Sequence, residues 1–180
     1  HETYKDQSNN WLSPEEIFSE DGENFYKKID QNEKVTIGHS ESMSKSKKNT
    51  IDPEKIIKEY GADATRLFIL SDSPPEKDVQ WSDSGIAAAY KFVQKFWLLH
   101  NKIINNNKRF TVFNNELEEF TNQIINQINL NLEKFRYNVL IANFHEIYNF
   151  LNKTLSKENW GSNFIDNYIK ILKIMTPVIP

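Results

Sequence analysis

The chain has 180 residues, 38% of them hydrophobic and 13% aromatic, so it is long enough to bury a hydrophobic core in one or two domains. It has no cysteine, which excludes disulfides and thiolate metal sites and fits a reducing cytoplasm. It has neither a run of about 18 apolar residues nor a charged leader followed by an apolar segment, so we expect no membrane span and no signal peptide. The net charge of −3 hides an asymmetry: residues 1 to 80 carry 11 Lys and Arg against 17 Asp and Glu, whereas residues 81 to 180 carry 11 against 8, so the second half is the better candidate for contact with a polyanion such as RNA.

Residues 1 to 40 mix short β-prone pieces with turn-forming residues. Thr3-Tyr4 and Val35-Thr36-Ile37 favour strands, and Asp21-Gly22 favours a turn. Ser13-Pro14-Glu15-Glu16 has the order of a helix start, with a serine cap, proline at the first position and a glutamate placed for a capping box. The sequence therefore predicts a small, irregular α/β segment with a helix of two turns at most.

The stretch Ser42-Met43-Ser44-Lys45-Ser46-Lys47-Lys48-Asn49 is the most informative in the chain. Small hydroxyl residues and three lysines within four positions are typical of a mobile cationic loop that closes over phosphates. Asp52-Pro53-Glu54 then has the residues of a helix N-terminus, because each satisfies or complements exposed backbone N–H groups. The loop is expected to end on a rigid helix.

Two short helices are expected next, over residues 53 to 60 and from a cap at Asp63 to about residue 70, with Gly61 ending the first. Pro74 and Pro75 forbid helix and predict an extended turn between residues 71 and 82. This region connects the loop to the second half of the chain.

From residue 84 onward, apolar residues recur at spacings of three and four, which predicts four antiparallel amphipathic helices joined by short loops. The expected buried faces are formed by Ile86, Ala89, Tyr90, Val93, Phe96, Trp97 and Ile104; by Leu117, Phe120, Ile124 and Ile128; by Tyr137, Leu140, Ile141, Phe144, Ile147, Tyr148 and Leu151; and by Phe164, Ile165, Tyr168, Ile171, Leu172 and Met175. The fold class is thus mainly α: an antiparallel helical bundle preceded by a small irregular α/β segment.

Lys91, Lys95 and Lys102 lie on one side of the first bundle helix, opposite Tyr90, Val93 and Trp97. A charged stripe of this kind is typical of any soluble helix, and it could also line a phosphate backbone. His39, His100 and His145 are widely separated and lack a partner at metal-ligand spacing, so no metal site is expected.

The loop resembles the Lys-Met-Ser-Lys-Ser signature of class I aminoacyl-tRNA synthetases. The resemblance continues through Tyr60-Gly61-Ala62-Asp63-Ala64-Thr65-Arg66-Leu67-Phe68, Asp72-Ser73-Pro74-Pro75-Glu76-Lys77-Asp78, Trp81 and Gly85. Within that class the chain is most similar to the bacterial-type leucyl-tRNA synthetase family, and the isoleucyl, valyl and methionyl enzymes are the alternatives. One position departs from the signature, because Ser42 stands where the family has its first lysine.

The resemblance implies ATP-dependent activation of leucine, with Mg²⁺, and transfer of leucine to tRNA(Leu). Lys45 would be the catalytic residue that stabilises the leaving pyrophosphate, within an ATP-binding loop of Ser42, Met43, Ser44, Lys45 and Ser46. The helices would form the anticodon-binding bundle, with tRNA contacts at Lys91, Lys95 and Lys102. The implied divisions are residues 1–50, the end of the catalytic region; 51–82, connecting helices; and 83–180, a truncated bundle.

The nucleotide-binding signature His-x-Gly-His of this family is absent from the chain. We therefore expect a monomeric fragment of a longer enzyme, inactive by itself because electrostatic stabilisation needs a positioned transition state. The alternative from another class is a non-catalytic helical tRNA- or RNA-binding module that kept a decayed loop. Ser42 and the missing signature favour that alternative, and the continuity of the resemblance favours the enzyme.

Overall fold

The computed structural model describes residues 1–106 and 109–180. The chain divides into two compact units, residues 1–56 and residues 57–180, and the division falls within the first α-helix. Each unit has its own secondary structure and its own buried side chains.

The first unit is built from short antiparallel strands. One sheet has the order β2-β1-β5, with Tyr4 opposite Leu12 on one side and Ile37 on the other, and β3 and β4 form a separate pair. The predicted strands around Thr3 and Thr36 are confirmed. The elements are β1 (Thr3–Lys5), β2 (Trp11–Leu12), β3 (Ile17–Phe18), β4 (Tyr26–Lys27), β5 (Thr36–Gly38) and the 3₁₀ turns η1 (Pro14–Glu16) and η2 (Lys45–Lys47).

The core of this unit is small, and polar contacts supplement it. Its buried apolar side chains are Tyr4, Leu12, Ile17 and Val35, with Phe25 packed against them. The predicted capping box is present, since the Glu16 carboxylate accepts hydrogen bonds from the Ser13 N–H (2.7 Å) and hydroxyl (3.0 Å). The helix that it starts is a single 3₁₀ turn, because Ile17 turns into β3 and is buried.

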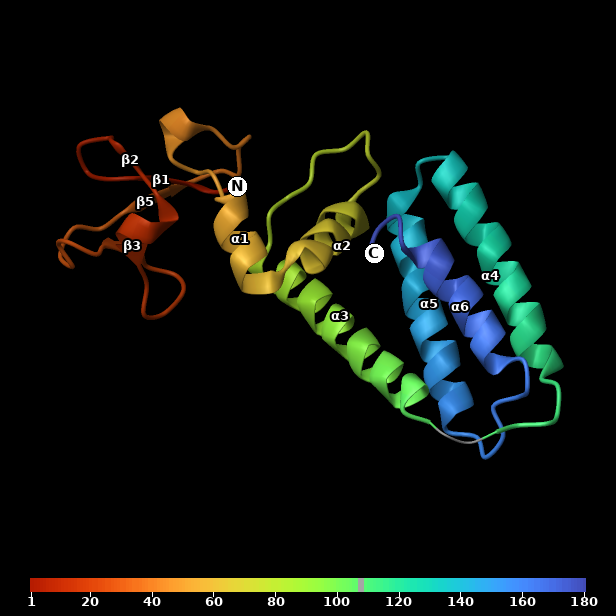
Figure 1. Cartoon of the computed structure of the whole chain (residues 1–180). Coiled ribbons are helices and arrows are strands. Elements are labelled where there is room, and N and C mark those ends of the chain that lie inside the picture. Colours follow the sequence, from red (N-terminus) through yellow and green to blue (C-terminus); the bar gives the residue numbers. More distant parts are fainter. Residues whose placement is uncertain (107–108) are drawn as a thin grey trace. The chain divides into compact units, whose positions relative to one another are not determined.

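The second unit is helical, and the predicted mainly α fold is confirmed. Successive helices from α3 to α6 run in alternating directions, and α4 packs against both α5 and α6 (Figure 1). The helices are α1 (Pro53–Tyr60), α2 (Ala62–Asp72), α3 (Asp83–Ile104), α4 (Asn115–Glu133), α5 (Tyr137–Leu155) and α6 (Phe164–Met175). As expected, no helix forms between Ser73 and Ser82, where Pro74 and Pro75 lie.

The bundle core follows helical spacing. On α5, Leu140, Phe144, Ile147 and Leu151 are all at most 1% exposed, and they recur at intervals of four, three and four residues. Leu117, Ile124 and Ile128 of α4 and Phe164, Tyr168, Ile171 and Met175 of α6 are buried as predicted. The prediction was wrong for Ile165, which is 51% exposed because it lies about 100° around the helix from the buried Phe164. Burial of these side chains is the main stabilising contribution to the unit.

The predicted face of α3 was partly wrong. Trp97 and Ile104 are 63% and 55% exposed, whereas Phe92, Leu99 and Ile103 are buried. Because α3 contacts α2 on one side and α5 on another, its buried stripe is centred one position away from the one that spacing suggested. Trp97 instead lies on the flank of the stripe and stacks on His100 at a ring distance of 5.4 Å.

The start of α4 is tied to the start of α6 by a polar network. Asn114 caps α4 by accepting a hydrogen bond from the Leu117 N–H (3.1 Å), and its own N–H donates to Asn163 Oδ1 (3.0 Å). The Asn114 side-chain amide also donates to the Trp160 carbonyl (3.0 Å). Gly161, at φ +105°, allows this close approach, because a Cβ at this position would lie 2.4 Å from Asn114 Cβ.

Candidate functional site

The cationic loop lies between β5 and α1. Its centre is the 3₁₀ turn η2, in which Lys45, Ser46 and Lys47 follow Ser44 in extended conformation. The two serine hydroxyls that flank Lys45 contact each other, with 2.7 Å between Ser44 Oγ and Ser46 Oγ. The loop therefore has a defined backbone around Lys45.

A buried asparagine closes the loop. Asn49 is 0% exposed, and its Oδ1 accepts a hydrogen bond from the Ser44 N–H at 2.8 Å. Its amide nitrogen points at the carbonyl oxygens of His1, Glu41 and Ser42, at 3.3, 3.5 and 3.4 Å. Asn49 has no predicted role, since three of its partners lie five to eight residues away along an irregular loop and the fourth, His1, lies 48 residues away.

Two of the three loop lysines are paired with carboxylates. Lys47 forms an ion pair with Glu41, and the Lys48 Nζ lies 3.1 and 3.3 Å from the two carboxylate oxygens of Glu16. The hydrogen bond from Lys47 holds the pKa of Glu41 below its usual range. The pKa of Glu16 is lowered first by the Ser13 N–H and then by Lys48.

Lys45 differs from its neighbours. Its side chain is exposed, and within residues 1–106 and 109–180 its ammonium group forms no ion pair or side-chain hydrogen bond. It is thus the loop cation that is ready to meet a phosphate oxygen without first losing a protein partner. Ser42 and Met43 are also exposed, and both precede the anchored Ser44 N–H.

The loop ends on a helix with the predicted start. The first turn of α1 is capped by Asp52, whose carboxylate accepts a hydrogen bond from the Glu54 N–H at 3.0 Å. Pro53 occupies the first helical position, where a missing N–H costs nothing. The residue before the closing Asn49 is Lys48, which is left-handed at φ +53° and turns the chain inward.

Three lysines of the bundle lie along α3. Lys91, Lys95 and Lys102 are all exposed, so the structure places them on the solvent side, as the spacing predicts. Lys95 and burial together lower the pKa of His145 on α5, burial being the larger cause. These lysines form a cationic surface that can contact a phosphate backbone.

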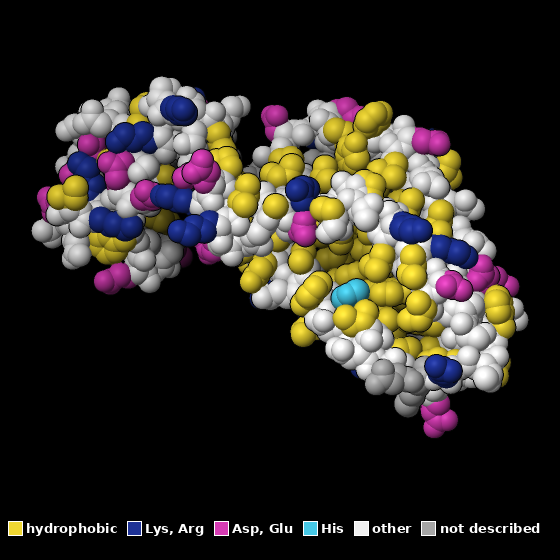
Figure 2. Space-filling model, viewed as in Figure 1, with side chains coloured by type: hydrophobic (Ala, Val, Ile, Leu, Met, Phe, Trp, Pro, Cys, Tyr) yellow, Lys and Arg dark blue, Asp and Glu magenta, His cyan; other side chains and the backbone are white. Residues whose placement is uncertain are grey.

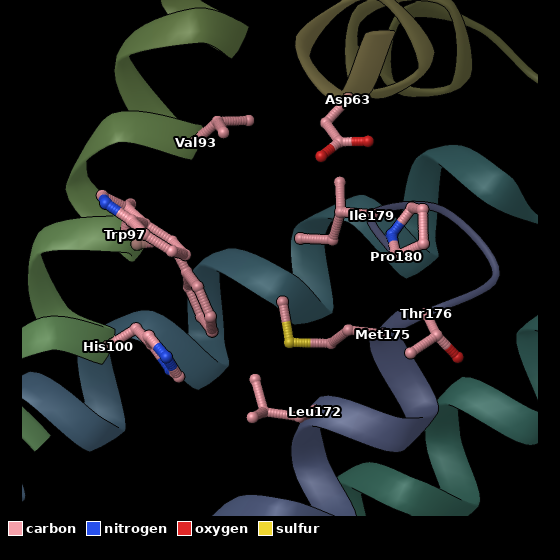
Figure 3. A pocket seen from close by; sticks show the side chains of 10 residues that line it. Asp63, Val93, Trp97, His100, Leu172, Met175, Thr176, Ile179 and Pro180 are labelled. Carbon is pink, nitrogen blue, oxygen red and sulfur yellow. The ribbon is translucent and has the colours of Figure 1, made fainter. Parts of the chain in front are cut away.

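A separate apolar hollow lies in the helical unit, where hydrophobic side chains gather on the face seen in Figure 2. It has a volume of about 330 Å³, and Val93, Phe96, Trp97 and His100 of α3 form one wall. The opposite wall is formed by Leu172, Met175, Thr176, Ile179 and Pro180, with Asp63 of α2 at the edge (Figure 3). His100 Nδ1 lies 2.8 Å from the hydroxyl of Tyr168, whose pKa burial raises to about 12.

Neither a metal-binding cluster nor a membrane-spanning helix is found among the residues that the structure describes. No group of three or more His, Asp or Glu side chains there is arranged to hold a metal ion. No helix of the described part is long and apolar enough to cross a membrane.

Comparison with known proteins finds similar synthetases over the region that contains this loop. Residues 2–82 match the model of the class I tRNA synthetases for isoleucine, leucine, methionine and valine. A leucine–tRNA ligase of Rickettsia bellii is 39% identical over 183 residues, which covers 100% of this chain and 21% of the relative. One of Orientia tsutsugamushi is 37% identical, with 100% and 21% covered. The resemblance to leucyl-tRNA synthetases is confirmed.

A solved structure supports the fold of the chain. It is the LeuRS of Agrobacterium radiobacter K84 in a ternary complex with tRNA and LeuAMS, matched with a TM-score of 0.62 and 21% identity over 77% of this chain and 19% of that one. The chain spans about a fifth of the length of the leucine–tRNA ligases that it matches. At that identity the match concerns the arrangement of helices and strands, and the site residues are argued from their own geometry.

Proposed function

We propose that this chain supplies the phosphate-binding loop and part of the tRNA-binding helical bundle of a leucine–tRNA ligase. Similarity to leucine–tRNA ligases over the whole chain supports the proposal. The observation that carries it is the exposed ammonium of Lys45, which has no ion-pair partner among the described residues, on a loop whose backbone Asn49 anchors. An anchored cation of this kind is suited to stabilise charge that develops on a phosphate group.

In the proposed reaction the carboxylate of leucine attacks the α-phosphorus of ATP, and the bond to the β-phosphate breaks. Leucyl-adenylate and pyrophosphate result, and the leucyl group then passes to the terminal adenosine of tRNA(Leu). Lys45 contacts the phosphates and offsets the negative charge that grows on the leaving pyrophosphate. Ser42, Met43, Ser44 and Ser46 shape the loop around it.

Mg²⁺ is proposed to enter with ATP. The described residues contain no cluster of three possible ligands, and Mg²⁺ is commonly held by substrate phosphates with one or two carboxylates. When bound, the ion neutralises phosphate charge. Lys45 adds a second positive charge from the protein side.

The activity is proposed for the whole natural protein and not for residues 1–180 alone. The His-x-Gly-His segment of the family does not occur in this sequence, and Lys45 needs a nucleotide positioned by other residues. We assign residues 1–50 to the end of the catalytic region and residues 83–180 to the bundle, and residues 51–82 connect these two parts. Lys91, Lys95 and Lys102 are proposed to face tRNA.

The test replaces Lys45 in the natural protein that contains this chain. Lys45→Ala is expected to slow leucine-dependent ATP–pyrophosphate exchange by at least about tenfold, equivalent to about 1.4 kcal/mol of transition-state stabilisation. Lys28→Ala is the matched control, because Lys28 is an exposed lysine of the same unit outside the loop. A Lys45→Ala rate within about twofold of the Lys28→Ala rate would remove Lys45 from the mechanism.

Ser42 favours a second candidate, a non-catalytic tRNA-binding module that kept a decayed loop. It removes one charge near the nucleotide, and Lys47 and Lys48 compensate little while their carboxylate partners hold them. A natural protein that binds tRNA but exchanges pyrophosphate with no amino acid would establish this module. Exchange that depends on isoleucine, valine or methionine in place of leucine would instead assign a sister synthetase.

A further inference from the structure

The side chain of Asn49 joins the two ends of the cationic loop. Its Oδ1 accepts from the N–H of Ser44, the residue directly before Lys45, at 2.8 Å. Its amide nitrogen reaches the carbonyls of Glu41 and Ser42, at the start of the loop, and that of His1, 48 residues away in sequence. One buried side chain thus contacts four backbone groups around Lys45.

An amide is the side chain that this position requires. The N–H of Ser44 donates to the Asn49 oxygen, and the carbonyls accept from its nitrogen, so a group with only one of these functions loses the contacts on one side. The carbonyls of His1 and Glu41 also accept from each other's main-chain nitrogen, so Asn49 is a second donor to them. A carboxylate would place negative charge against three carbonyl oxygens. Lys48, at φ +53°, provides the turn that carries the Asn49 side chain into the interior.

The ion pairs of the loop are weaker anchors than Asn49. In the Lys48–Glu16 pair the side chains are 48% and 39% exposed, and the Lys47–Glu41 pair is similarly open. Exposed pairs of this kind contribute little to structure and are screened by salt. Asn49 is fully buried, so its hydrogen bonds are shielded from competing water.

We propose that Asn49 is a positioning residue that fixes the loop so that Lys45 faces the phosphates of ATP. This inference rests on the proposed function, since it assigns to Asn49 an effect on nucleotide activation. It acts through the Ser44 N–H, one residue before Lys45, and touches no substrate. Because the loop is already ordered, Lys45 contacts the pyrophosphate without a loss of loop conformational entropy at each turnover.

The test compares Asn49→Asp with Asn32→Asp in the natural protein. Asp at residue 49 keeps the acceptor for Ser44 but loses both N–H donors, whereas Asn32 is exposed and gives a matched change of charge in the same unit. We expect Asn49→Asp to lower kcat/KM for ATP in pyrophosphate exchange by at least about tenfold and to leave the KM for leucine within about twofold. Asn32→Asp is expected to stay within about twofold in both.

A second readout separates positioning from loss of folding. Transfer of leucine from synthetic leucyl-adenylate to tRNA involves no triphosphate, so Asn49→Asp is expected to leave its rate within about twofold. Equal losses in exchange and transfer would show a general structural role and overturn the proposal. No loss in exchange would overturn it as well.

Limited trypsin digestion tests the anchoring without any enzymatic assay. The loop carries Lys45, Lys47 and Lys48, and we expect Asn49→Asp to speed cleavage after them by several-fold relative to Asn32→Asp. Unchanged cleavage would refute the anchoring even if the protein is an active ligase. If the unsubstituted protein shows no leucine-dependent exchange, the proposed function fails, and the digestion still decides whether Asn49 holds the loop.

Discussion

Replacement of Gly161 by alanine tests how the start of α4 is joined to the start of α6. Gly161 has φ +105°, and an added Cβ would lie 2.4 Å from Asn114 Cβ and 2.9 Å from Asn163 Oδ1. Backbone strain of this kind costs about 1–3 kcal/mol. Displacing Asn114 adds about 1–3 kcal/mol of overpacking and weakens the cap of α4, worth about 1 kcal/mol. We expect Gly161→Ala to lower the free energy of unfolding by about 3–7 kcal/mol.

The matched control is Gly61→Ala, in the same unit. Gly61 has φ +82°, but no atom lies within 4 Å of its added Cβ, so only the strain of about 1–3 kcal/mol applies. Urea unfolding of both variants, followed by the helical circular dichroism signal, gives the two free energies. Equal losses, or a smaller loss for Gly161→Ala, would refute the steric argument about Asn114.

Three further predictions concern charge and backbone conformation. Lys48→Gly is expected to stabilise the first unit by about 0.5–1 kcal/mol in chemical unfolding. Glycine removes the backbone strain of a left-handed residue, and only an exposed ion pair is lost. Lys47→Gly, at a position without this strain, should destabilise the unit. The pKa of Asp6 is lowered to about 2, chiefly by the hydrogen bond from the Asn10 N–H. The stability that this carboxylate contributes is therefore present above about pH 4 and is lost as the pH falls through about 2. Asp6→Asn is expected to remove this loss when the free energy of unfolding is measured against pH. Replacement of Lys91, Lys95 and Lys102 of α3 by alanine should weaken tRNA binding by the natural protein. The slope of log K against log salt concentration should fall in magnitude by about 2 to 3. An unchanged slope would show that these lysines do not contact phosphates.

The helices were predictable because their signals are local. Proline at residue 53 and the acidic cap before it mark the start of α1, and the spacing from Leu140 to Leu151 marks the core face of α5. The face of α3 was less predictable, since Trp97 and Phe92 are both apolar and only the neighbouring helices decide which is buried. Hydrophobic spacing gives the existence of a face more securely than its centre.

The first unit shows what local patterns leave out. Strands of two residues, such as Trp11–Leu12 and Tyr26–Lys27, are too short for an alternating pattern, so they were missed. The loop lysines were visible in the sequence, but their partners were not: Glu16 lies 32 residues from Lys48. The role of Asn49 likewise depends on a carbonyl 48 residues away, which only the fold brings near.

The most direct test of the account is ATP–pyrophosphate exchange by the natural protein, with leucine, isoleucine, valine and methionine supplied separately. The account predicts exchange with leucine alone, despite Ser42 at the first position of the loop signature. Exchange with none of the four would contradict it and make the non-catalytic tRNA-binding module the leading explanation.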